Sequence, residues 1–375
     1  MNFDFPDDLK HLREEARKIL RQKCPPAVPR GVLESDAAYD AGLWSEIARL
    51  GWLGAAIPEE HGGSGLGALA LCVLAEELGY VLAPLPFSSS VCGAADAILQ
   101  IGSPAQKAQW LPRLASGEAI GTLALAERPG AFLPSRLASQ AVDGRITGRK
   151  IAVLDGQCAT MAVVAALDTR GRPSLHIVDL CGPGVVRLSE TSFDPSRKLA
   201  AFEFDGAPAE PLGTGGEIEL RRLLDRFAVM MAFEQLGGAQ AALDQAKAYA
   251  LERYAFGRPI GSFQAIKHKL ADMYVAVELA RSNAYWGAWA LTTDAHDLPL
   301  AAATARIAAS DAGWLTSKEN IQTHGGMGYT WEGDSHLYYR RAKLLSLALG
   351  SPREWKRRLM GELTSRNATS LAMME

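Results

Sequence analysis

Three apolar stripes with helical spacing run through the last third of the chain and narrow its possible folds. Residues three and four positions apart share one face of an α-helix, so each stripe marks a long helix that buries one side. Long helices of this kind pack against one another as an antiparallel bundle. The stripes are Ala239, Leu243, Ala246 and Ala250; Ile266, Leu270, Met273, Val277, Ala280 and Ala284; and Ala301, Ala305, Ala308, Ala312 and Leu315.

The rest of the chain divides into a helical part and a strand-rich part. Residues 5–114 show helical patterning interrupted by Pro and Gly. Between residues 121 and 212, Asp143-Gly144 predicts a hairpin turn, and apolar or alternating runs predict strands at 161–167, 175–180 and 199–204. We therefore expect an α+β protein without βαβ alternation, with domains at 1–118, 119–214 and 215–375.

Composition argues against several classes of protein. The net charge is −3, which gives no general attraction to nucleic acid or to anionic lipid. No apolar run is long enough for a transmembrane helix, and Met1–Leu12 carries charges where a signal peptide needs apolar residues. The 5 cysteines are scattered and form no CxxC pair, so neither a disulfide framework nor a metal site is indicated. We expect a cytoplasmic protein.

Two segments of the C-terminal part could bind a ligand. Residues 252–264 predict a Gly and Pro turn between helices that presents Arg253, Phe256 and Gln264. An arginine suits a pyrophosphate and a phenylalanine suits a planar ring, although a helix-helix corner with a surface arginine is the alternative. Residues 322–329 place glycines where a ligand could approach the backbone, or where a turn is simply needed. His324 could be an acid or base, or a loop histidine paired with its neighbours.

Taken together, four stretches resemble the acyl-CoA dehydrogenase family over essentially the whole chain. They are 51–65 followed by 76–79, then 253–264, 322–328 and 340–343. The resemblance implies an N-terminal helical domain, a middle β-barrel domain and a C-terminal four-helix bundle, assembled as a dimer of dimers with FAD between neighbouring subunits. It also implies which residues hold the ADP half of the neighbour's flavin. These are Arg253, Phe256, Gln264, Gln322, Gly325 and Gly326, all present here.

The catalytic glutamate that the resemblance implies is missing. Family members remove a proton beside the thioester carbonyl and pass hydride to the flavin, and the base must be a carboxylate within reach of that proton. Its usual position holds Leu349, and the alternative position on the first bundle helix holds Phe227. Asp225 and Glu234 are nearby carboxylates, but helical geometry turns them away from that position, so they are weak candidates. The sequence thus predicts no catalytic base in this chain.

The middle part also departs from the family. Where members usually have Thr-Glu-Pro followed by Gly-Ser-Asp, residues 126–132 read Ala-Glu-Arg-Pro-Gly-Ala-Phe. The second flavin strand, usually Trp-Ile-Thr or Trp-Ile-Ser, reads Ala152-Val153-Leu154. An indole and hydroxyl groups that would serve the flavin are therefore absent, which would leave its polar edges poorly paired.

The missing base and the missing flavin contacts would serve this chain's own substrate and flavin. The residues for a neighbour's ADP are retained, and we call them the clamp: Arg253, Phe256, Gln264, Gln322, Gly325 and Gly326. We therefore expect the base-lacking subunit of a heteromeric α2β2 acyl-CoA dehydrogenase. Its partners would be a homologous base-bearing subunit, an acyl-CoA substrate of the bulky steroid side-chain type, and an electron-transfer flavoprotein as acceptor. Two alternatives remain: a self-sufficient homotetramer with a non-standard base, and a flavin-free binding or scaffold protein of the same fold.

Overall fold

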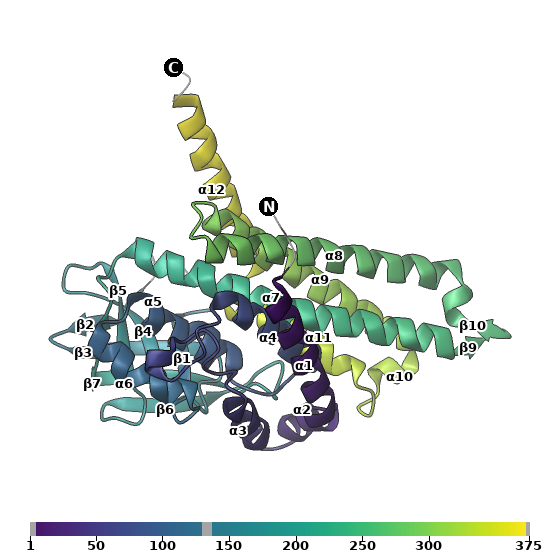
Figure 1. Ribbon diagram of the computed structural model, residues 1–375, viewed down its shortest axis with the longest axis horizontal. Coiled ribbons are helices and arrows are strands. Elements are labelled where there is room, and N and C mark those ends of the chain that lie inside the picture. The colour runs from purple at the N-terminus through teal and green to yellow at the C-terminus, as the bar shows by residue number, and fades with distance from the viewer. Residues whose placement is uncertain (1–4, 130–136, 373–375) are drawn as a thin grey trace.

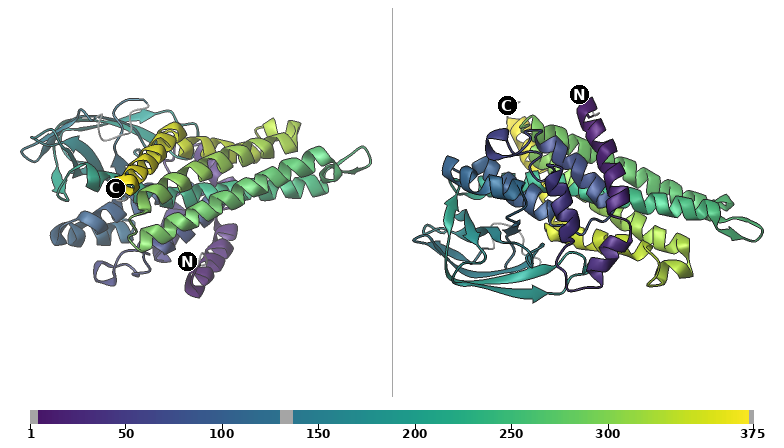
Figure 2. Two further views of the ribbon diagram at one scale, coloured as in Figure 1. Left: turned by 90° about the horizontal axis from the view of Figure 1, so that it is seen from above. Right: turned by 60° about the horizontal axis from the view of Figure 1, so that its bottom comes forward.

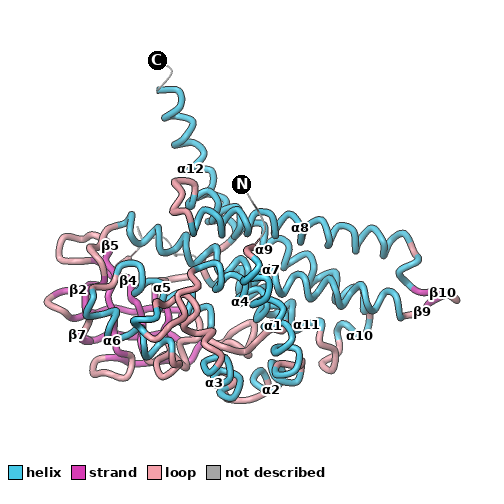
Figure 3. Tube along the Cα trace, in the orientation of Figure 1, coloured by secondary structure: helices cyan, strands magenta, loops and turns pink. Residues whose placement is uncertain are grey.

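The computed structural model describes residues 5–129 and 137–372, and it arranges them as helices, then a sheet, then helices (Figure 1). This order confirms the predicted α+β class. The strands gather at one end of the molecule, and long helices extend to the other end (Figure 3).

The N-terminal part is helical throughout. Its α4 is buried on almost every side, because it is apolar all round and lies between α1 and the bundle. The two carboxylates of α4 are paired: Glu76 with Arg13 and Arg281, and Glu77 with Arg17. The helices are α1 (Asp7–Lys23), α2 (Ala27–Leu33), α3 (Ala41–Arg49), η1 (Glu59–His61), α4 (Ala68–Tyr80), the π-helix η2 (Ser88–Ala95), α5 (Asp96–Ile101) and α6 (Pro104–Ala115).

The middle part forms one sheet in the order β6-β7-β3-β2-β4-β5-β8, with β1 paired to β4. Its strands are β1 (Gly121–Ala124), β2 (Gln140–Val142), β3 (Arg145–Val153), β4 (Met161–Leu167), β5 (Pro173–Asp179), β6 (Val185–Glu190), β7 (Leu199–Pro208) and β8 (Glu210–Leu212). The hairpin between β2 and β3 turns at Asp143 and Gly144, both with positive φ, which confirms the predicted turn.

The C-terminal part is the predicted bundle of long helices. Most of the stripe residues are buried where these helices pack, including Met273, Val277, Ala280 and Ala284 on α8. Its final helix, α12, projects away from the bundle (Figure 1). The elements are α7 (Glu217–Glu252), β9 (Tyr254–Ala255), β10 (Arg258–Pro259), η4 (Ile260–Ser262), α8 (Gln264–Thr292), α9 (Leu298–His324), α10 (Gly326–Tyr329), α11 (Ser335–Ala348) and α12 (Pro352–Ala372).

The N-terminal helices and the bundle share one hydrophobic core, in which α4 lies directly against α7. Two glycines allow this close approach. A Cβ atom at Gly79 would lie 2.0 Å from the Glu234 carbonyl oxygen, and one at Gly237 would lie 1.9 Å from the Glu76 carbonyl oxygen. Further views show these helices alongside the bundle (Figure 2). No helix in the described ranges is both long and apolar enough to cross a membrane.

Candidate active site

Leu349 and Phe227, the two positions where the sequence predicts a missing base, line the same small cavity. Leu349 ends α11, and its carbonyl oxygen accepts a hydrogen bond from the Trp355 indole nitrogen at 2.7 Å. Phe227 comes from the N-terminal third of α7, so two distant segments converge here. The cavity volume is about 20 Å³, enough for a water molecule but not for an acyl chain.

The polar groups around this cavity are already engaged. Ser89, on η2, donates its hydroxyl to Asp155 Oδ2 at 2.5 Å. Thr122, on β1, donates its hydroxyl to the Leu154 carbonyl oxygen at 2.7 Å. The described lining residues include no carboxylate, histidine or lysine. The cavity therefore offers no group that can take a proton from a substrate.

Glu234 is held in a buried ionic cluster rather than directed at the cavity. Its Oε1 lies 2.9 Å from Arg197 Nη1 and 3.3 Å from Arg341 Nη1. Arg197 also pairs with Asp155, and Arg341 with Asp194. Burial alone would lower the pKa of Arg197, but these carboxylates outweigh it and raise the pKa. The cluster joins the sheet to α7 and α11, which assigns Glu234 a structural role.

The other weak candidate base, Asp225, contacts α12 rather than the cavity. Its Oδ2 accepts a hydrogen bond from Arg358 Nη2, on α12, at 2.6 Å, and its side chain is buried. Burial raises the pKa of Asp225 from 3.8 to about 7, even though Arg358 acts in the opposite direction. Asp225 is not among the described residues that line the cavity. Its contact with Arg358 joins α7 to α12 instead.

The raised pKa of Asp225 gives a pH-dependent prediction. Between pH 3.8 and about 7 the folded protein binds a proton here that the unfolded chain releases. The stability of the wild type relative to Asp225→Asn should therefore fall by about 2–4 kcal/mol as the pH rises through this window. Urea unfolding across the pH range measures this difference, with Asp8→Asn, a substitution at an exposed position of α1, as the control. A difference that rises with pH would contradict the assignment.

The elements that carry the six predicted clamp residues, namely the β9–β10 turn with the adjoining helix ends and α10, lie toward the end of the bundle far from the sheet (Figure 1). Arg253 follows α7, Phe256 lies in the β9–β10 turn and is 95% exposed, and Gln264 begins α8. Of the others, Gln322 lies in the last turn of α9, Gly325 follows that helix, and Gly326 begins α10.

The ends of α7 and α9 are tied together by aromatic stacking between Tyr249 and His324, whose ring centroids are 4.2 Å apart. His324 Nδ1 is also within 2.9 Å of the Asn320 carbonyl oxygen, so this histidine is engaged by its neighbours. The clamp and the Leu349 cavity are thus separate sites, at opposite ends of the same helices.

Comparisons with known proteins identify the family. A family model described as the acyl-CoA dehydrogenase N-terminal domain matches residues 6–118, and one described as the C-terminal domain matches residues 214–362. The acyl-CoA dehydrogenase IpdE2 of Mycobacterium tuberculosis is 34% identical over 361 residues, covering 96% of this chain and 98% of that protein. The chain belongs to the acyl-CoA dehydrogenase family. Members of this family are FAD-dependent oxidoreductases that act on acyl-CoA.

Solved structures of family members have the same fold. The ChsE4-ChsE5 complex of Mycobacterium tuberculosis includes a chain with a TM-score of 0.90 and 29% identity, covering 97% of this chain and 99% of that one. A variant of Tcur3481-Tcur3483, described as a steroid ACAD, gives a TM-score of 0.89 and 32% identity, with the same coverage of both chains. Among relatives by sequence, the acyl-CoA dehydrogenase FadE27 of Mycobacterium tuberculosis is 30% identical, covering 97% of this chain and 99% of that protein.

The groove that would receive this acyl-CoA dehydrogenase chain's own flavin does not fit it well. The groove is about 330 Å³, lies between the sheet and α11, and includes Ala126 and Ala152. The Ala152 N–H already donates to Glu190 Oε2 at 2.6 Å, and the Ser351 hydroxyl donates to Glu354 Oε2 at 3.1 Å. These two donor hydrogens are therefore already engaged within the protein. The predicted departures at Gly130, Ala131 and Phe132 lie outside the described residues.

The clamp fits the cofactor better, because its arginine, phenylalanine and glutamines are exposed and can receive a phosphate and a ring.

Sequence reasoning missed several residues that define this region. Glu190 was not singled out, although its carboxylate engages the Ala152 backbone. Nor did the sequence indicate that Arg197 and Arg341 hold Glu234, since these residues are far apart in the chain. Both arginines stand beside other polar or charged residues, at 194–198 and 340–343, so no local pattern marks either of them as buried and paired.

Proposed function

We propose that this chain is the base-lacking subunit of a heteromeric α2β2 acyl-CoA dehydrogenase. The observation that carries the proposal is the contrast between its two sites. The cavity at Leu349 and Phe227 is small and has no proton acceptor among its described lining residues, while the arginine, phenylalanine and glutamines of the clamp are all present and exposed. Such a chain can support the flavin of a neighbour without performing the chemistry itself.

In the assembly, each chain has a distinct task. A homologous partner supplies the glutamate that removes the proton beside the thioester carbonyl, and FAD accepts the hydride when it is bound. This chain contributes Arg253, Phe256 and Gln264, with Gln322, Gly325 and Gly326, to the ADP half of that flavin. An electron-transfer flavoprotein is the proposed acceptor. The similarity to the ChsE4-ChsE5 complex and to a steroid ACAD supports a heteromer acting on steroid-derived acyl-CoA. We expect it in the cytoplasm, where free cysteines such as those described here persist.

The two alternatives are less well supported. A self-sufficient homotetramer needs a base, but Glu234 is tied to two arginines and Asp225 to Arg358. A flavin-free scaffold has no need for an exposed Arg253 and an almost fully exposed Phe256 in the clamp arrangement.

Turnover of a steroid side-chain acyl-CoA with an artificial electron acceptor tests the proposal. We expect no turnover with this chain alone and measurable turnover when it is co-expressed with a glutamate-bearing homologue. Replacing the partner's glutamate with glutamine should abolish the rate, whereas Leu349→Met in this chain should leave it within about twofold, since no proton moves to that position. Turnover by this chain alone would overturn the proposal.

A further inference from the structure

Arg30, on the short helix α2, reaches from the N-terminal part of the chain to the connection between α10 and α11. Its Nη1 donates to the Trp331 carbonyl oxygen at 2.6 Å, and its Nη2 donates to the Gly333 carbonyl oxygen at 3.1 Å. Nη2 also donates to Asp334 Oδ1 at 2.9 Å, which makes an ion pair. The Arg30 side chain is only 19% exposed, so these contacts are partly shielded from water. One guanidinium thus holds residues 331–334 against α2.

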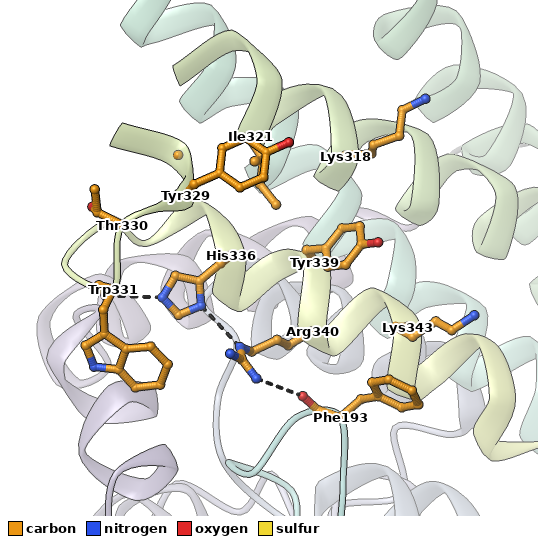
Figure 4. Close-up of a pocket in the computed structure, with 11 residues that line it drawn as sticks. Phe193, Lys318, Ile321, Tyr329, Thr330, Trp331, His336, Tyr339, Arg340 and Lys343 are labelled. Atoms are coloured by element: carbon orange, nitrogen blue, oxygen red, sulfur yellow. Dashed lines mark hydrogen bonds between the residues drawn. The ribbon is translucent and has the colours of Figure 1, made fainter. Parts of the chain in front are cut away.

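Glu34, which follows α2, makes a second link to the same connection. Its Oε1 accepts a hydrogen bond from the Trp331 indole nitrogen at 2.7 Å. Residues of α11 contact the same indole, at the edge of a pocket of about 600 Å³ (Figure 4). The His336 ring stacks on it with 5.2 Å between centroids, and the Arg340 guanidinium lies 5.5 Å from its centroid. Trp331 is therefore held by side chains from both α2 and α11.

The segment that α2 holds is packed against α10, which carries part of the clamp. A Cβ atom at Gly333 would lie 2.6 Å from the Met327 carbonyl oxygen, so the two backbones are in close contact. The Gly328 N–H donates to the Gly325 carbonyl oxygen at 3.0 Å, so a backbone hydrogen bond closes the turn that contains Gly326. The position of residues 331–334 is thus coupled through α10 to the two glycines of the clamp.

The turn at Gly325 and Gly326 has little packing of its own. No atom of the described chain outside the immediate neighbours lies within 4 Å of a Cβ built at either glycine. Gly325 also has a φ of +59°, a backbone conformation that favours glycine. Segments with few contacts open locally at low free-energy cost. The shape of this turn therefore depends on the contacts made by the residues that follow it.

We propose that Arg30 is a positioning residue for the clamp. By holding residues 331–334, it keeps the turn at Gly325 and Gly326 in the shape that receives the ADP half of a neighbour's flavin. The inference rests on the proposed function, since the clamp does, and it adds that the N-terminal part of the chain sets the geometry of a site on the bundle.

Hydrogen exchange of the full-length chain, followed by mass spectrometry of its peptides, tests this coupling without flavin. We expect Arg30→Gln to speed the exchange of amides in residues 325–334 by about tenfold or more, because charge-assisted hydrogen bonds that oppose local opening are lost. Amides of α4 should exchange as in the wild type. Glu34→Ala, which removes the Trp331 link, should have a smaller effect in the same residues, and it provides the test if Arg30→Gln does not fold.

Flavin release from the assembled heteromer tests the consequence for the clamp. We expect FAD to dissociate about fivefold faster from Arg30→Gln than from the wild type, because the turn is less often in its binding shape. Arg30→Lys should restore part of the retention, since an ammonium group can replace some of the lost hydrogen bonds. Arg49→Gln is the matched control: this arginine of α3 is 68% exposed and pairs with Glu46, so its removal should change neither exchange nor retention.

Unchanged exchange at residues 325–334 in Arg30→Gln, or equal acceleration in α4, would overturn the inference. So would wild-type FAD retention in Arg30→Gln under conditions in which Arg253→Gln loses its flavin. Wild-type retention in both variants, with faster exchange at residues 325–334, would support the coupling but contradict the clamp itself. The two experiments thus separate a failure of this inference from a failure of the proposed function.

Discussion

Replacing Glu234 with alanine is expected to lower the free energy of unfolding by about 3–5 kcal/mol, because two buried arginines lose the carboxylate they share. The side chains of Arg197 and Arg341 are only 2% and 3% exposed, so water cannot replace the lost partner. Asp155 and Asp194 would remain, but Arg197 Nη1 would lose the Glu234 carboxylate to which it donates, and Arg341 Nη1 would keep only the 3.3 Å contact with the Ala83 carbonyl oxygen among the described residues. Urea unfolding followed by circular dichroism measures the change.

Glu60→Ala is the matched control, since that glutamate is 77% exposed and its removal should change stability by no more than about 0.5 kcal/mol. Glu234→Gln should fall between the two, because its amide oxygen can still accept from one arginine. A loss below about 1 kcal/mol for Glu234→Ala would contradict the structural role of this carboxylate. It would also reopen Glu234 as a candidate base.

Replacing Arg253 with glutamine should weaken FAD binding in the assembled heteromer by about ten- to a hundredfold, since an arginine-phosphate contact is lost. Arg253 is exposed at the end of α7, so the substitution should leave the fold of this chain intact. Release of flavin on dilution, followed by its fluorescence, measures the change. The reduced flavin content should lower turnover in proportion.

Arg221→Gln provides the control for this experiment. Arg221 is a partly exposed arginine on α7, but it lies near the opposite end of the helix and pairs with Glu217. We expect its removal to leave flavin binding unchanged. Wild-type flavin retention in Arg253→Gln would show that this chain does not hold the neighbour's ADP.

Much of the fold could be predicted because its signals are local. The stripe at Met273, Val277, Ala280 and Ala284 identifies α8 from spacing alone, and the turn at 143–144 identifies the β2–β3 hairpin from two residues. These features depend on neighbours in the chain. The family resemblance supplied the arrangement of the three parts, and the described helices and strands confirm it.

The interior of the site could not be predicted, because its contacts join distant segments. Glu234 looked like a weak candidate base, yet its role depends on Arg197 and Arg341, which are 37 and 107 positions away. The cavity forms where Leu349, at the end of α11, and Phe227, on α7, line the same space. Neither spacing nor propensity carries that information, since side-chain packing decides it.

The flavin content of the purified protein tests the central claim most directly, namely that this chain clamps a neighbour's flavin but builds no complete site of its own. Visible absorbance gives the ratio of flavin to polypeptide. We expect the chain alone to be free of flavin, and its complex with a base-bearing homologue to hold about half an equivalent per chain, since one site forms per pair of unlike chains. About one equivalent per chain in the protein purified alone would contradict the account.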